Sequence, residues 1–224
     1  MSESKLDLKK RRIREFFSTF KLGHKYKDQE INEIQEEAYK KGMIYVQMRL
    51  PVENITKEFE DALKEKIEHS FIQAKIRVAT RGDLSAIMEL YNKSWLTANT
   101  PFRPIEISSL KTIFDDPDTI FLIAKVYGRD SGFVILDFEG DNKEFAIIAA
   151  LGVLPRFQRK GLGTVLGMAA WNHIKENHPN VKELRCEVYK DNNISSNFIK
   201  WIGFKEFGKK LYRKEDFLIE EDIE

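Results

Sequence analysis

The sequence predicts an α/β (α+β) domain preceded by a helical extension, and three observations support this prediction. Helical periodicity dominates before about residue 73, strand and helix patterns are mixed after it, and three successive strand patterns are separated by glycine-containing turns. We therefore divide the chain into a mostly helical N-terminal extension, residues 1–72, and a second domain, residues 73–224.

The extension contains three helix patterns and one short strand pattern. In chain order we expect a helix over 7–23, a helix over 28–42, a strand over 43–50 and a helix over 53–71. The last helix has an apolar residue at every fourth position: Ile55, Phe59, Leu63 and Ile67. We expect the extension to pack on the main domain or on a second copy of the chain, so a homodimer is one option.

A basic run, residues 9–14, lies opposite the phenylalanine face of the first predicted helix. It fits a nucleic-acid patch, a membrane-surface helix or a solvated face, and the solvated face is the commonest case. The helix predicted over 28–42 is acidic and would repel phosphate, which argues against nucleic acid as a partner.

The second domain mixes strands with helices. We expect a strand over 74–80, helices over 81–95 and 104–116, strands over 119–127, 131–139 and 143–154, a helix from about 161 to 178, a strand over 181–189, a helix ending at Gly203, and a closing hairpin over 204–220. The three successive strands predict an antiparallel meander.

The composition narrows the class of protein. With 42% hydrophobic and 33% charged residues and a net charge of +1, the chain fits a soluble globular protein and not one that coats nucleic acid. The single cysteine, Cys186, excludes an internal disulfide and fits a reducing cytosol, and the four histidines have no zinc-site spacing. No apolar run is long enough to span a membrane, and no secretory signal is present. We expect a cytoplasmic protein without a metal.

The most informative stretch is the strand–turn–helix segment AALGVLPRFQRKGLGTVLG, residues 149–167. Pro155 ends an apolar strand, and two glycines, Gly161 and Gly163, open the next helix. A helix start normally carries acidic residues, yet this one follows Arg159 and Lys160. Free N–H groups at a helix start, beside cationic side chains, form an anion site suited to a pyrophosphate.

This arrangement resembles the acyl-CoA-binding motif of the GNAT superfamily of N-acetyltransferases. The resemblance rests on the Q-x-x-G-x-G stretch of residues 158–163, which follows a strand ending in residues 151–155. A second motif agrees with the family in order and spacing: Glu187-Val188, Asn192, Ser195 and Gly203-Phe204. The resemblance covers roughly residues 73–224 and is closest to the ribosomal-protein and N-terminal acetyltransferase type. It implies a mixed, mostly antiparallel sheet flanked by helices.

The resemblance also implies roles for individual residues, with acetyl-CoA as the cosubstrate. The strand before the loop splays from its neighbour, so Leu151 and Val153 would offer backbone groups to the pantetheine arm, and Val153 N–H would hold the oxyanion. Asn192 and Ser195 would contact the pantetheine or position the thioester. The pyrophosphate would bind to the loop and helix start: Gln158, Arg159, Lys160, Gly161, Leu162, Gly163 and Thr164.

The chemistry implied is direct attack of an amine on the acetyl group, with a base that removes a proton from the ammonium. Glu187 matches the base of the N-terminal acetyltransferases, although a charged residue on a solvated strand is an equal alternative. Further options for the base are Asp137, Glu139 and Glu144, whose facing depends on register. The segment 91–107 would border the acceptor, where an aromatic core is the commoner role for residues such as Tyr91, Trp95, Phe102 and Arg103.

One position departs from the family. Many members have a proton-donating tyrosine where this chain has Ile199. Tyr189 is a candidate substitute, and the thiolate could also leave unaided. The leading hypothesis is therefore an N-acetyltransferase acting on a protein N-terminus, a lysine or a small-molecule amine. The alternative is a catalytically weak acyl-CoA-binding module that acts through its N-terminal helices on a protein or nucleic-acid partner.

Overall fold

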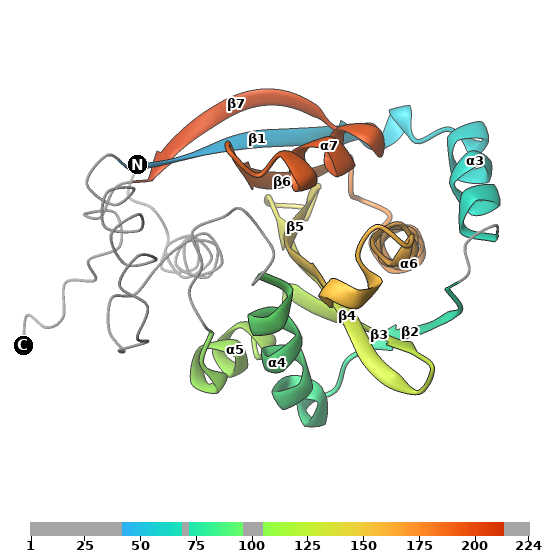
Figure 1. The fold of residues 1–224 in the computed structure, drawn as a ribbon. Helices are drawn as coiled ribbons and strands as arrows, with labels where there is room; N and C mark the ends of the chain where they lie inside the picture. Colours follow the sequence, from blue (N-terminus) through green and yellow to red (C-terminus); the bar gives the residue numbers. More distant parts are fainter. Residues whose placement is uncertain (1–41, 69–71, 96–104, 213–224) are drawn as a thin grey trace, which may run out of the picture.

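A single seven-stranded sheet with helices on both faces organises the described part of the protein (Figure 1). The computed structural model describes residues 42–68, 72–95 and 105–212. Its helices and strands are, in chain order, β1 (Met43–Pro51), α3 (Lys57–Glu68), β2 (Ala74–Val78), α4 (Leu84–Ser94), α5 (Ile107–Phe114), β3 (Thr119–Val126), β4 (Arg129–Glu139), β5 (Phe145–Val153), α6 (Leu162–Asn177), β6 (Glu183–Tyr189), α7 (Asn193–Trp201) and β7 (Lys205–Tyr212).

The strand order is β2-β3-β4-β5-β6-β1-β7. All neighbours are antiparallel except β5 and β6, which are parallel. The meander β3-β4-β5 confirms the prediction made from the three successive strand patterns. The mixed, mostly antiparallel sheet is thus the one that the family resemblance implied.

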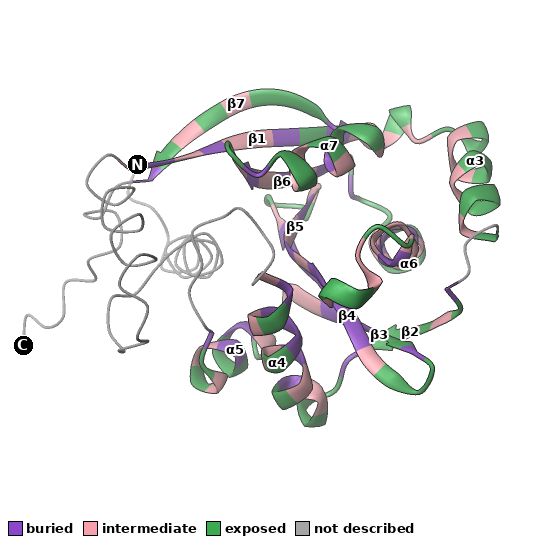
Figure 2. Ribbon diagram, in the orientation of Figure 1, coloured by how far each residue is buried: buried purple, intermediate pink, exposed green. Residues whose placement is uncertain are grey.

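Two large apolar clusters lie on the two faces of the sheet, and the central strands of the sheet contain many of the buried residues (Figure 2). Successive residues of β4 alternate between them, because side chains of a strand point to opposite faces. Val134 and Leu136 join the cluster under α6, and Phe133 and Ile135 join the cluster under α4 and α5. The sheet is therefore a central layer between two helical layers.

The described part of the N-terminal region is integrated with the rest of the fold. Strand β1 lies between β6 and β7 and pairs with both along its length. Helix α3 turns its half-buried stripe of Phe59, Leu63 and Ile67 inward, and the last two pack against the α6-side cluster. The boundary at residues 72 and 73 thus has no counterpart in the sheet, and the domain division stays a prediction.

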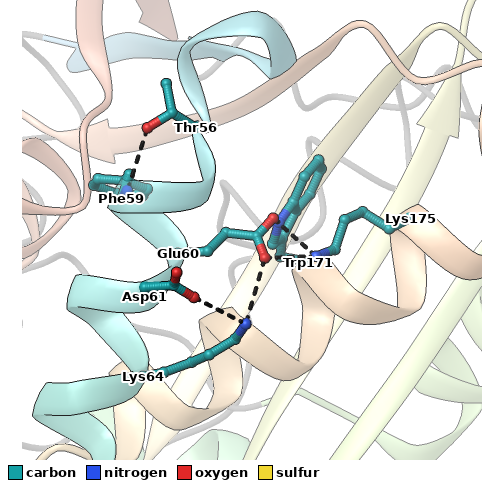
Figure 3. A network of polar contacts seen from close by, with 7 residues as sticks. All are labelled: Thr56, Phe59, Glu60, Asp61, Lys64, Trp171 and Lys175. Carbon is teal, nitrogen blue, oxygen red and sulfur yellow. Dashed lines mark hydrogen bonds and ion pairs between the residues drawn. The ribbon is translucent and has the colours of Figure 1, made fainter.

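A polar network fastens α3 to α6 (Figure 3). Glu60 accepts a hydrogen bond from Trp171 Nε1 at 2.7 Å and pairs with Lys175 at 2.7 Å. Burial favours the neutral form of Glu60, but the bonds from Lys175 and Trp171 outweigh it and lower the pKa of the carboxyl. The described helix of the extension is therefore joined to the helix that follows the glycine loop.

The C-terminal hairpin prediction falls only partly on the described residues. Its first half is strand β7, which pairs with β1 from the N-terminal region. Pairing with β1 completes the ladder on that side of β7, which the sequence pattern could not reveal. The second half of the hairpin and the helices predicted over 7–23 and 28–42 lie outside the described residues.

Candidate active site

Strands β5 and β6 pair only where they begin. Residues 145–147 of β5 lie opposite 183–185 of β6, after which β5 runs on to Val153 and β6 to Tyr189 with no further pairing between them. A bulge at Ala149 bends β5 in this region, because Ile135 lies opposite Ala150 while Leu136 lies opposite Ile148. The separation expected from the family resemblance is therefore present at the C-terminal ends of these two strands.

The backbone of Val153 points toward this separation. Leu154 N–H donates to Ser131 O at 3.0 Å, so the next pair along the ladder, Val153 with Gly132, is a non-hydrogen-bonded one. The N–H and C=O of Val153 therefore face away from β4, and the same alternation applies to Leu151, two residues earlier. The structure orients both residues as the resemblance required, while their contact with a ligand stays a prediction.

The glycine loop adopts a conformation that leaves its amides open. After a short 3-10 turn at Pro155–Phe157, Arg159 has a φ of +58° and Gly161 a φ of +92°. Helix α6 begins at Leu162 with no capping side chain and no acidic residue in its first turn. Among the described residues, no hydrogen-bond acceptor is found for the N–H groups of residues 159–164. These donors are therefore open to an external acceptor, and the anion site predicted from the sequence stays a prediction.

Gln158 fixes the start of this loop. Its Nε2 donates to Val153 O at 3.0 Å and approaches Ser94 O, at the end of α4, at 3.5 Å. The side chain thus joins the loop to the end of β5 and to the last turn of α4. It positions the amides, which is a more specific role than opening the loop. The side chains of Arg159 and Lys160 are exposed beside it, and Leu162 is buried in the core.

Asn192 and Ser195 lie at the start of α7. The buried Asn192 side chain accepts a hydrogen bond from Ser195 N–H at 3.0 Å and so caps the helix. A contact of either residue with the pantetheine stays a prediction. Phe198, further along α7, lies 3.4 Å from the place that a Cβ on Gly163 would occupy, so α7 also packs close to the first turn of α6.

Glu187 lies on β6 and is half-buried. Its two carboxylate oxygens accept one hydrogen bond each: Oε1 from Gln47 Nε2 at 3.2 Å and Oε2 from Tyr212 Oη at 2.6 Å. These two donors were missed by sequence reasoning. Gln47 belongs to the extension and Tyr212 to the C-terminal strand, and no local motif links either of them to Glu187.

The other candidates for the base lie at the wrong end of β5. Asp137 is opposite Ile147 and Glu139 is opposite Phe145, whereas Val153 is opposite Gly132. At about 3.3 Å per residue, Asp137 is about 20 Å from the Val153 end of β5. Glu144 precedes β5 and accepts a hydrogen bond from Asn142 N–H at 3.0 Å. Strand register therefore places Asp137 and Glu139 away from the Val153 end of β5, where the resemblance puts the thioester carbonyl.

The residues of segment 91–107 that were expected near the acceptor lie in different environments. Tyr91 is buried against Phe133, and burial raises the pKa of its phenol, so its role as core is confirmed. Trp95 is half-buried beside it, and Phe102 and Arg103 lie outside the described residues.

Two residues are relevant to the proton donor that many family members have and that this chain lacks at position 199. Ile199 is buried in the core under α7, so this position has no proton donor. Burial and the neighbouring Asp191 raise the pKa of Tyr189, which keeps its hydroxyl protonated at neutral pH.

With this geometry in place, comparison with known proteins identifies the class. The described residues combine a seven-stranded mixed sheet, in which β5 and β6 separate, with an uncapped, glycine-bearing helix start that follows β5. The model of the acetyltransferase (GNAT) family matches residues 84–204, which is more than half of the 224 residues. The chain belongs to this family and is an acyltransferase enzyme, and acetyl-CoA as its cosubstrate fits the open amides.

Individual relatives agree with this assignment. An N-alpha-acetyltransferase of Sulfurisphaera tokodaii is 28% identical over 158 residues, which cover 66% of this chain and 87% of the relative. The crystal structure of PaiA N-acetyltransferase from Thermoplasma acidophilum, in complex with coenzyme A, matches with a TM-score of 0.50 at 22% identity and covers 62% of this chain and 99% of its own. A tandem GNAT protein from the clavulanic acid biosynthesis pathway matches with a TM-score of 0.58 at 11% identity, covering 87% of this chain and 60% of its own.

Neither a metal site nor a membrane-spanning helix is found within the described residues. No group of three or more histidine, cysteine, aspartate or glutamate side chains within residues 42–68, 72–95 and 105–212 is arranged to hold a metal ion. In the same ranges, none of the helices combines the length and the apolar character that crossing a membrane requires.

Proposed function

We propose that this enzyme transfers the acetyl group of acetyl-CoA to a primary amine, with the α-amino group of a polypeptide as the first acceptor class to test. The observation that supports acetyl-CoA binding most directly is the set of open N–H groups over residues 159–164 at the start of α6. The similarity to an N-alpha-acetyltransferase supports the choice of acceptor. Lysine side chains and small-molecule amines are the competing acceptor classes.

The proposed binding mode divides the cosubstrate between three elements. The amides of Arg159 to Thr164 hold the pyrophosphate, and the exposed cationic side chains of Arg159 and Lys160 add attraction. The outward-facing backbone of Leu151 and Val153 holds the pantetheine arm in the gap between β5 and β6. Asn192 and Ser195 border the arm from the α7 side. Acetyl-CoA supplies an activated thioester carbonyl when it is bound.

The proposed chemistry assigns one task to each reacting group. Val153 N–H donates a hydrogen bond to the carbonyl oxygen as negative charge develops there. Glu187 accepts the proton that the ammonium must lose before or during attack, directly or through a water molecule. The low proton affinity of a thiolate lets it leave without a donor at position 199. We also propose a cytoplasmic location, which a single buried cysteine suits.

The test is thiol release from acetyl-CoA over a panel of peptides with free N-termini, peptides with only lysine amines, and small amines. Burial, with the nearby charge of Glu187, raises the pKa of Cys186, the chain's single cysteine, so the folded protein contributes little thiol background. We expect turnover that is greatest with free peptide N-termini.

Glu187→Gln should reduce kcat by about 10²-fold or more, the usual scale for losing a general base. Glu89→Gln, which removes an exposed carboxylate on α4, is the matched control. Turnover confined to lysine or small amines would refute the polypeptide N-terminus as acceptor. The alternative of a binding module is favoured by Ile199, and it requires CoA binding with no turnover of any amine.

A further inference from the structure

Three neighbouring strands each contribute one residue to a cluster around the Glu187 carboxylate. Glu187 is on β6, Gln47 lies directly opposite on β1, and Tyr212 reaches it from β7 on the far side of β1. Each carboxylate oxygen has its own donor, at 3.2 Å for Gln47 and 2.6 Å for Tyr212. A carboxylate held at both oxygens has a defined orientation.

Local backbone features of β7 make room for this cluster. The ladder between β1 and β7 is interrupted between Gln47 and Met48, and Gly208 lies opposite Gln47. A Cβ on Gly208 would lie 2.8 Å from Gln47 Oε1, which is closer than a real Cβ contact. The absence of a side chain at residue 208 therefore lets the Gln47 amide lie over β7 and direct its Nε2 toward Glu187.

The Tyr212 ring is also fixed in place by the side chains that pack around it. It is 2% exposed and packs edge-on against Tyr45, with ring centroids 5.4 Å apart at 87°. Lys210 Nζ lies 4.4 Å from the centroid of the same ring. A buried ring between these neighbours keeps its hydroxyl at a fixed place, so the 2.6 Å bond to Glu187 does not depend on a mobile side chain.

We propose that Gln47 and Tyr212 are positioning residues that hold the Glu187 carboxylate oriented toward the incoming amine. Both lie outside the family match of residues 84–204, so membership of the family does not assign them. The inference rests on the proposed role of Glu187 as the base. In the proton transfer, Glu187 gains the ammonium proton while Tyr212 keeps its own, and Glu187 then returns that proton to water.

Other charged and titratable groups share this face with Glu187. Strand pairing places on the same face of β6, β1 and β7 the side chains of Glu183, Arg185, Tyr189, Tyr45, Arg49, Lys205 and Lys210. Among the described groups on this face, Gln47 and Tyr212 are the ones that donate a hydrogen bond to Glu187. The test therefore removes these two donors while the other groups stay in place.

The experiment compares Tyr212→Phe and Gly208→Ala with the wild-type enzyme in the full chain. Tyr212→Phe removes one hydroxyl, and Gly208→Ala displaces Gln47 while both hydrogen-bonding residues remain. Tyr127→Phe, which removes a hydroxyl from a 77% exposed ring in the β3–β4 turn, is the control. The readouts are kcat and KM for the best acceptor, CoA affinity by calorimetry, and the free energy of unfolding in urea, which separates a loss of stability from a loss of kcat in the folded enzyme.

We expect Tyr212→Phe to lower kcat about tenfold while the KM for the acceptor and the CoA affinity stay unchanged. Gly208→Ala should act in the same direction with a smaller loss of kcat. A kcat of folded Tyr212→Phe equal to that of the wild type would overturn the inference. If Glu187→Gln keeps full activity, the proposed base itself is wrong; if Glu187→Gln loses activity and Tyr212→Phe does not, only the positioning role is wrong.

Discussion

The starts of helices α6 and α7 differ in whether a side chain of the protein caps their free N–H groups. Helix α7 is capped from within the chain, because the Asn192 side chain accepts a hydrogen bond from Ser195 N–H. Helix α6 starts at a left-handed glycine, has neither a capping side chain nor an acidic first turn, and follows two cationic residues. The two helices follow β5 and β6, the strands that separate, and the uncapped start of α6 is the one that we propose for an external anion.

The largest expected effect comes from placing a carboxylate among the open amides. Gly163→Glu should weaken CoA binding by at least about 10²-fold, roughly 2.7 kcal/mol, because the new charge repels the pyrophosphate and competes for its donors. Gly167→Glu is the matched control in the same helix, since a Cβ there meets nothing within 4 Å. Calorimetry on folded protein measures both. Equal affinities for the two variants would contradict the assignment of the anion site.

Removing the internal cap of α7 should lower stability and not primarily binding. Asn192→Ala should reduce the free energy of unfolding by about 1 kcal/mol, since Ser195 N–H loses its acceptor. Asn193→Ala, at the exposed neighbouring position, should change it by less than about 0.5 kcal/mol, and Asn192→Asp should retain the cap. Urea unfolding checks all three. If Asn192→Ala is as stable as Asn193→Ala, the two helix starts do not differ as described.

A substitution in the first turn of α6 should have opposite effects on stability and binding. Thr164→Glu adds the acidic residue that this helix start lacks, so it should raise stability without ligand by about 0.3–1 kcal/mol. The same charge should weaken CoA binding several-fold. Thr164→Gln, which adds a side chain of similar size without the charge, is the matched control. A loss of stability together with unchanged affinity would show that these amides are not available to an anion.

At the C-terminal end of α6, the contribution to stability should depend on pH and not on ligand binding. Burial lowers the pKa values of His173 and His178, and this effect outweighs the attraction of Glu176 for the first and of Asp118 for the second. Lowered values mean that the unfolded chain binds more protons, so stability is complete above the unfolded pKa of about 6.5 and declines as pH falls below it. We expect a Tm that falls by a few degrees between pH 7 and 5, and a smaller fall in His173→Gln. An identical pH dependence in the two proteins would contradict this account.

Much of the fold and part of the site could be predicted because their signals are local. The meander shows in three consecutive strand patterns, and α3 shows in the four-residue spacing of its apolar stripe. The glycine loop has a similar advantage, because Pro155, Gln158 and Gly161 act on their own neighbours along the chain. The positions of the carboxylates considered as alternative bases could not be predicted, because the signal that sets them is not local. Their distance from Val153 depends on strand register, and a shift of one residue reverses the face of every side chain.

By itself the sequence determined that a glycine-bearing helix start with cationic neighbours follows a buried strand, and that Glu187, Asn192 and Ser195 have the spacing of an acetyltransferase. Only the tertiary structure decided that β1 separates β6 from β7 and that Gln47 and Tyr212 meet at Glu187. The physical reason is sequence separation. A cap or a turn depends on groups a few residues apart, whereas contacts across β1 depend on strand order, which is set by how the whole sheet buries its two faces.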